Sequence, residues 1–165
     1  MAHLKLKSMS DTDRGYYALV RQLLEDAPNA SFTVGIHDDE AGHEVYEPEQ
    51  GKASGITMSE LGEIHEFGLG VPQRSFIGDW FDETQDQKVK QIKGVALAFL
   101  KGKISHLSVG FEQLGNLYVG QVQKRMADGI DPPLSEITIA KKGSSVPLID
   151  TGQLRSSITY KVSEK

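Results

Sequence analysis

Residues 147–162 have the sequence PLIDTGQLRSSITYKV, and this stretch decides how the chain completes its fold. Asp150 and Thr151 are residue types that favour the N-cap of a helical turn, and Gly152 permits a positive φ. From Ile158 onward apolar and polar residues alternate with the two-residue period of a strand. The stretch therefore predicts a turn, a short capped helix and a final strand. It contains no nucleophile paired with a base, and we expect it to serve assembly.

The composition of the whole chain limits the classes of function. Its 165 residues, 38% hydrophobic and 25% charged, suit one globular domain. There is no cysteine, which excludes disulfides, thiolate catalysis and cysteine-ligated zinc. A formal net charge of −5 argues against a dedicated nucleic-acid binder, because such proteins carry clustered positive charge. No apolar run approaches the ~18 residues of a membrane span, and we see no signal peptide, so we expect synthesis in the cytoplasm and no membrane partner.

Apolar residues with helical spacing predict helices over about 11–27, 58–67, 80–101 and 109–128. Their predicted N-caps are Ser10, Thr57, Asp79 and Ser108. Thr57 and Glu60 form a capping box, and Gly68 is the expected left-handed C-cap. We expect the apolar stripes of three of these helices to be buried, namely Tyr16, Leu19, Val20, Leu23 and Leu24; Phe81, Val89, Ile92, Ala96, Phe99 and Leu100; and Phe111, Leu114, Leu117, Tyr118, Val122 and Met126.

Alternating residues predict strands at 31–37, 137–141 and 158–162, with a further short strand near Val45. The strands at 137–141 and 158–162 are expected to pair antiparallel around the loop between them. The fold class is therefore α+β: a single domain over residues 11–163, in which an antiparallel sheet of about four strands packs against three to four helices. Residues 1–10 are expected to form a flexible arm or edge strand, and residues 38–55 a long surface loop.

Catalytic and metal-binding interpretations find little support in the residue patterns. His37 and His43 flank an acidic loop, but their spacing fits no metal-site template. His65 lies between Glu63 and Glu66, yet the second histidine of a zinc-protease helix is missing. We therefore expect a solvated loop and a polar helix face, with no catalytic residue, metal or cofactor. A metal-assisted hydrolase that uses His37, His43 and His65 remains the alternative.

The basic residues suggest structural contacts. Arg74 is expected either to be exposed or to clamp a carboxylate of the same or a neighbouring subunit. Arg155 is close enough in sequence to fold back on Asp150 and brace the turn. Lys141 and Lys142 form the one basic loop tip that could touch phosphates. A small DNA-binding adaptor is thus a further alternative, which the negative charge of the chain disfavours.

Two segments together resemble a bacteriophage virion-morphogenesis family. Residues 64–68, IHEFG, and 71–77, VPQRSFI, resemble its EFG…PxRPF pattern, with Ser75 where that family usually has proline. Residues 147–158 resemble its PLIDTGxLxxSI signature, and residues 34–36, VGI, match one of its strands. The resemblance spans about residues 31–162.

This resemblance implies a tail-completion or neck protein, that is, a head–tail connector in the virion. Such subunits form a homo-oligomeric ring, commonly sixfold, although twelvefold symmetry stays open. The implied partners are adjacent neck, adaptor or portal proteins and tail terminator or tail-tube proteins, with genomic DNA passing through a channel without specific binding. No cofactor or catalytic centre is implied. The residues expected at the subunit interface or in its supporting motif are Glu66, Phe67, Gly68, Pro72, Arg74, Phe76, Leu148, Asp150, Thr151, Gly152, Leu154 and Arg155.

Overall fold

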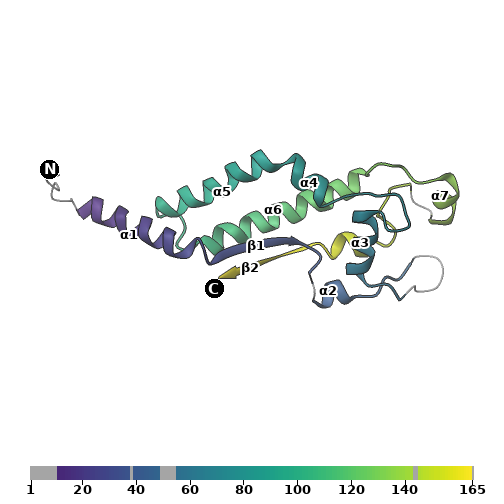
Figure 1. Cartoon of the computed structure of the whole chain (residues 1–165), viewed down its shortest axis with the longest axis horizontal. Helices are drawn as coiled ribbons and strands as arrows, with labels where there is room; N and C mark the ends of the chain where they lie inside the picture. The colour runs from purple at the N-terminus through teal and green to yellow at the C-terminus, as the bar shows by residue number, and fades with distance from the viewer. Residues whose placement is uncertain (1–10, 38, 49–54, 143–144, 165) are drawn as a thin grey trace, which may run out of the picture.

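The computed structural model describes residues 11–37, 39–48, 55–142 and 145–164, which mix helices with a two-stranded antiparallel sheet. Figure 1 shows the order of the elements. They are α1 (Asp11–Asp26), β1 (Ala30–Gly35), α2 (Glu40–His43), α3 (Met58–Phe67), α4 (Gly78–Glu83), α5 (Gln85–Leu100), α6 (Leu107–Asp128), α7 (Glu136–Lys142), α8 (Gln153–Ser156) and β2 (Thr159–Glu164). The predicted arm over 1–10 with its cap Ser10, and residues 49–54 of the predicted loop, lie outside the described residues.

The sheet joins the two ends of the described chain. β1 pairs antiparallel with β2, in a register that runs from Ala30 opposite Glu164 to Gly35 opposite Thr159 (Figure 1). The predicted strands near 31–37 and 158–162 are thereby confirmed. The predicted partner of the last strand is wrong, because β2 pairs with β1 and not with residues 137–141.

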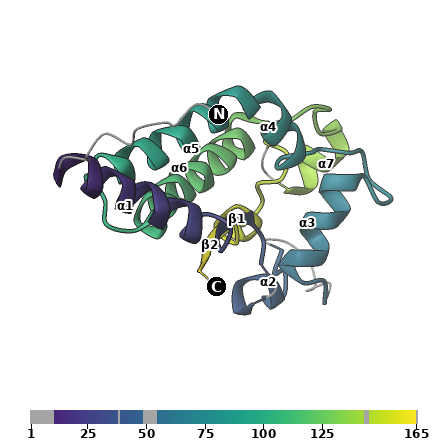
Figure 2. The same ribbon diagram turned by 60° about the vertical axis from the view of Figure 1, so that its left-hand side comes forward.

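Helix α6 forms the spine against which the sheet packs (Figure 2). The ring of Phe32 on β1 lies 5.2 Å from that of Phe111 and 5.8 Å from that of Tyr118. Trp80 completes the aromatic cluster, 5.4 Å from Tyr118. The buried core around α6 consists of Met58, Phe76, Trp80, Leu114, Tyr118, Val122, Met126, Ile130, Leu148, Leu154 and Ile158.

The predicted strand at 137–141 is helix α7 instead. Ser135 starts this helix, because its hydroxyl accepts a hydrogen bond from the backbone N–H of Thr138 at 3.2 Å. Ile137 is exposed in this helix. Alternating residues form a strand only where a neighbouring strand is available to pair with them. Val45 makes only an isolated bridge to Thr57. Among the described residues the sheet has two strands, and the four-stranded arrangement is not confirmed.

Two predicted helix boundaries shift for a physical reason. The helix expected at 80–101 is divided at Thr84 into α4 and α5, where the Thr84 hydroxyl donates to the carbonyl of Trp80 at 2.6 Å. Asp79 does not cap it, since α4 starts at Gly78 and takes its cap from outside the helix. α6 begins at Leu107, one residue before its expected cap Ser108. The predicted 38–55 loop contains the short helix α2, with Asp39 as N-cap.

Two of the three apolar stripes expected to be buried are buried only in part: Leu19, Val20 and Leu23 on α1 and Ala96 and Leu100 on α5 are half-buried, and Phe99 on α5 is fully buried. Tyr16 and Leu24 on α1 are exposed, and so are Phe81 on α4 and Val89 and Ile92 on α5. The third stripe, on α6, is buried as expected at Leu114, Tyr118, Val122 and Met126, whereas its Leu117 is exposed. No helix in the described ranges is long and apolar enough to span a membrane.

Candidate interaction site

The carboxylate of Glu66 is the central group of the first motif. Its Oε1 accepts from the hydroxyl of Ser75 at 2.6 Å and from Gly78 N–H at 2.8 Å. Its Oε2 accepts from the N–H groups of Phe76 at 2.9 Å and Ile77 at 3.1 Å. Four donors therefore converge on one carboxylate at the start of α4, where the helix dipole favours negative charge. Our expectation that Glu66 would face solvent is wrong.

Arg74 lies in the same loop, is buried, and holds the loop in place through its hydrogen bonds. It is 5% exposed, and its Nε donates to the carbonyl of Pro132 at 2.8 Å. Its terminal nitrogens donate to the carbonyls of Pro133 at 3.3 Å and Pro72 at 3.4 Å. The expectation that Arg74 is exposed is wrong, and within the described residues its guanidinium binds backbone carbonyls in place of the expected carboxylate; the clamp on a neighbouring subunit stays a prediction. Arg74 ties the first motif to the connector between α6 and α7.

The capping box and the glycine at the end of α3 shape the rest of the first motif. Thr57 and Glu60 exchange the two expected hydrogen bonds, so the predicted capping box is confirmed. Gly68 has φ 70° and ψ 40°, the predicted left-handed C-cap. A Cβ on Gly68 would lie 2.9–3.1 Å from atoms of Gln73, so the chain returns too closely for another residue.

The second motif forms the predicted turn and short helix before β2, but the N-cap is Gly152 and not the expected Asp150 or Thr151. Gly152 has φ 83°, and the Thr151 hydroxyl accepts from Gln153 N–H at 3.4 Å. Asp150 accepts a hydrogen bond from the hydroxyl of Tyr46, and the side chain of Arg155 is exposed. The expected bond from Arg155 back to Asp150 is therefore replaced by one from a distant tyrosine. Leu154 is buried in the core.

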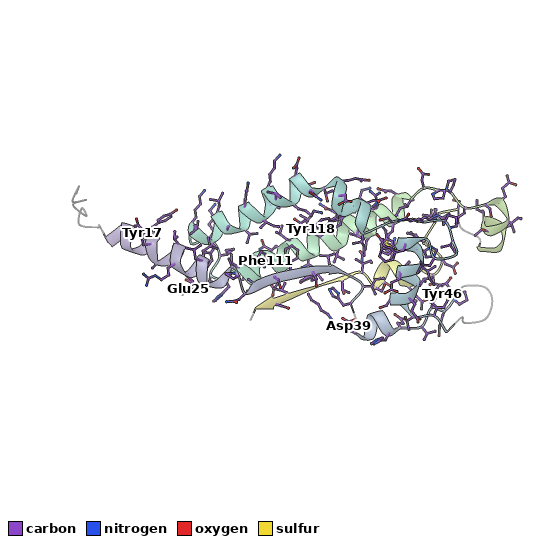
Figure 3. The ribbon with its side chains drawn as sticks, in the orientation of Figure 1. Tyr17, Glu25, Asp39, Tyr46, Phe111 and Tyr118 are labelled. Atoms are coloured by element: carbon purple, nitrogen blue, oxygen red, sulfur yellow. The ribbon has the colours of Figure 1, made fainter. Side chains whose placement is uncertain are left out.

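The two motifs meet at one cavity of about 220 Å³. The first motif and its helix line it with Leu61, His65 and Arg74. The second motif lines it with Leu148, Asp150, Thr151, Gly152, Gln153 and Leu154. Two segments that lie far apart in the sequence thus line the same cavity. Tyr46, which Figure 3 shows beside α3, lines the same cavity.

The predicted site residues divide into a buried group, an exposed group and three half-buried residues, Gly68, Asp150 and Gly152. Arg74, Phe76, Leu148 and Leu154 are buried, while Glu66 is partly buried and fully hydrogen-bonded. The exposed group is Phe67, Pro72, Thr151 and Arg155. The helical spacing of Leu61, Ile64 and Phe67 predicts that Phe67 faces inward, and this prediction is wrong, since Phe67 is 66% exposed.

Phe67 also belongs to an exposed apolar ridge that the sequence analysis did not single out. Leu69 and Val71, in the loop after α3, are exposed beside it. We call these three residues the 67–71 ridge. The open left-handed turn at Gly68 explains the ridge, because it reverses the chain before the core is reached.

Tyr46 and Gln153 were missed by the sequence analysis. Gln153 accepts from Glu47 N–H at 3.0 Å and donates to the Glu44 carboxylate at 3.4 Å. Burial, together with the hydrogen bond to Asp150 and its negative charge, raises the pKa of Tyr46. The one signal available was an aromatic residue in an otherwise polar loop.

The three histidines considered for metal binding lie on separate elements. His37, after β1, has its Nε2 2.8 Å from the Thr33 hydroxyl and its Nδ1 2.8 Å from that of Thr159. Burial and the charge of Lys161 lower the pKa of His37. His43 ends α2 and His65 lies on α3. Within the described ranges, no group of three or more histidine or acidic side chains is placed to hold a metal ion.

The chain matches no protein-family profile, no curated protein and no solved structure in comparisons of its sequence and fold.

Proposed function

We propose that this chain is a structural subunit of a ring in the neck of a tailed bacteriophage, between the portal-side complex and the tail. The sequence support is the resemblance of residues 64–77 and 147–158 to the two motifs of that family. The observation that carries the proposal is the convergence of both motifs on the cavity beside α3. Two signatures that meet in space form one structural unit, which can serve as a single contact site.

In this structural unit some residues fix the loop after α3 and others are exposed for contact with a neighbour, which suits assembly. Glu66 and Arg74 fix the loop after α3 through seven hydrogen bonds, four to the carboxylate and three from the guanidinium. A loop held in this way can present the 67–71 ridge to a neighbour at low entropic cost. Head-to-tail contacts of such a ridge with a different surface of the next copy build closed rings.

The charge of the chain fits a conduit for DNA. A formal net charge of −5 disfavours tight binding to phosphates, so DNA can slide through without being held. In this proposal the neighbouring neck, adaptor, portal and tail proteins are the lasting partners. DNA is only transient, and no cofactor takes part.

Electron microscopy of virions that carry an affinity-labelled copy of this chain tests the proposal. We expect the label in a symmetric ring at the head–tail junction, around an opening wide enough for duplex DNA. Class averages would also decide between sixfold and twelvefold symmetry. Label distributed over the capsid or tail tube, or absent from purified virions, would contradict the proposed function.

A further inference from the structure

Helix α1 carries an apolar stripe with one exposed edge. Tyr17, Val20 and Leu24 follow one another at helical spacing along one side of the helix, and of these Val20 is half-buried. Tyr17 is 62% and Leu24 69% exposed. The opposite edge, with Leu19 and Leu23, is half-buried, and α1 contacts α5. Figure 1 shows α1 projecting from one end of the molecule. A helix with two apolar edges, one of them open, needs a second partner.

An apolar groove of about 520 Å³ runs between β1 and the α4–α5 pair. Phe32 and Val34 form one wall, and Phe81, Val89 and Ile92 form the other. Trp80 and Tyr118 lie at its base. The second wall is 42–52% exposed, although its spacing marked it as a buried stripe. This wall of the groove is therefore an exposed apolar surface.

The two helices carry opposite net charge in the sequence. By sequence α1 has four acidic residues and two arginines, a net charge of −2. α5 has three lysines and one aspartate, a net charge of +2. Lys88 lies inside the groove, with its Nζ 4.6 Å from the centre of the Trp80 ring and 3.4 Å from that of Phe81. Lys88 is 7% exposed and its Nζ donates to the carbonyl of Phe81, so the exposed Lys90 and Lys93 are the cations of α5 that favour an acidic helix.

The α1 stripe does not cover the groove of its own chain. Only residues 27–29 separate α1 from β1, which holds the helix at one end of the molecule. In Figure 3, Tyr17 lies on the projecting helix, whereas Tyr118 at the base of the groove lies near the middle of the molecule. The helix and the groove are therefore available to different copies.

We infer that α1 of one copy lies in the groove between β1 and the α4–α5 pair of the next copy. The contact is head-to-tail, since each copy uses its helix on one side and its groove on the other. An amphipathic helix of 16 residues in an apolar groove is a common recognition mode. Closure of the contacts into a ring rests on the proposed function; the pairing of helix with groove does not need it.

Two variants separate the helix from the groove. Leu24→Glu places a charge on the α1 stripe, and Ile92→Glu places one in the groove. Both positions are exposed in the single chain, so we expect both variants to fold. Each alone should shift the sedimentation of the chain toward the monomer, because the helix–groove contact is lost and only contacts such as the 67–71 ridge remain. An equimolar mixture should form a 1:1 heterodimer and stop there, because one intact helix and one intact groove remain. Ile137→Glu, on exposed α7, is the control and should oligomerise like the unchanged chain.

Cross-linking tests the same contact directly, because the chain has no cysteine of its own. Leu24→Cys and Ile92→Cys single variants, mixed and treated with a short bismaleimide, should give a cross-linked heterodimer, and neither variant alone should give a comparable yield. A double variant should give a ladder that ends at the number of subunits in the ring. No heterodimer in the mixture overturns the inference, whatever the oligomeric state of the unchanged chain. Labelled rings in virions would then still support the proposed function.

Discussion

Glu66 shows how much a single side chain can organise in this molecule. One carboxylate holds the start of α4, the loop after α3 and the hydroxyl of Ser75. Each hydrogen bond to an ionised acceptor contributes about 1.5–3 kcal/mol to stability. A buried donor left without an acceptor costs a similar amount. The residue therefore stabilises the fold of the motif, and it supports function by fixing what surrounds it.

Glu66→Gln is expected to destabilise the chain by about 1–3 kcal/mol, because an amide keeps one acceptor oxygen but turns its NH₂ toward backbone donors. Urea unfolding followed by circular dichroism measures this change. Glu63→Gln, on the exposed face of the same helix, is the control and should stay within about 0.5 kcal/mol. Equal effects of the two substitutions would contradict the role assigned to Glu66.

The hydroxyl of Tyr46 gives a pH-dependent prediction. Tyr46→Phe should lower stability near pH 7 by about 1 kcal/mol, because Asp150 loses a donor. Burial and Asp150 raise the pKa of Tyr46 in the folded state above its unfolded value of about 10. Tyr46 thus stabilises the fold fully below that unfolded value, and this contribution is lost as the pH rises above it.

The difference in stability between the unchanged chain and Tyr46→Phe should therefore shrink from pH 9 to pH 11. Denaturant titrations of both proteins at several pH values measure it. The pKa of Tyr118 is also raised by burial, but it affects both proteins equally. A difference that stays constant over this range would show that Tyr46 ionises as freely in the folded chain as in the unfolded one.

At the scale of elements, the contact between α6 and β2 depends on small residues. Gly115 of α6 lies so close to the strand that an added Cβ would be 2.4 Å from the Tyr160 ring. Gly110 makes a similar approach to Val95 of α5. The helix can therefore pack a strand on one side and a second helix on the other, and glycine is required by contact here and not by backbone conformation.

Gly115→Ala is expected to destabilise the chain by about 1–3 kcal/mol through overpacking against Tyr160. Gly120→Ala on the same helix is the matched control, because nothing lies within 4 Å of its added Cβ. That control should stabilise by about 0.5–1 kcal/mol through helix propensity. Thermal unfolding of the two variants measures the contrast, and the same sign for both would contradict the packing described.

At the scale of the whole molecule, stability is distributed unevenly. α6 contacts both strands, α5 and α8 and carries much of the buried core. α1 projects from one end (Figure 1), and among its described side chains the exposed outnumber the half-buried. Segments with few buried contacts open at lower free energy than the core.

Hydrogen–deuterium exchange of the isolated chain should therefore show fast exchange in α1 and slow exchange in α6. If α1 enters the groove of a neighbour, its amides and those of α5 should gain protection together as the protein concentration rises. The Ile92→Glu variant serves as the control, in which α1 should stay fast at every concentration. Strong protection of α1 in the monomer would contradict the open stripe.

Local signals in the sequence determined much of the secondary structure. The capping box at Thr57, the left-handed glycine at Gly68 and the alternation before Gly35 and after Ile158 act over a few residues. The caps and strands that these signals produce need no contact with a distant part of the chain to be recognised, so they could be predicted from the sequence. The strand predicted at 137–141 is wrong because alternation is also a local signal. It shows that a strand is possible, but a strand forms only where the sheet offers a neighbour.

Only the tertiary structure decided which segments meet. Glu66 and Arg74 looked like exposed charges, since their partners come from the backbone of other segments and leave no pattern in the sequence. The pairing of β1 with β2 spans most of the chain. The sequence also marked the stripes of α1 and α5 as apolar, and the fold covers only part of each: Phe99 is buried, whereas Leu24 and Ile92 are exposed. Spacing fixes that a surface is apolar; three-dimensional packing decides whether the same chain covers it.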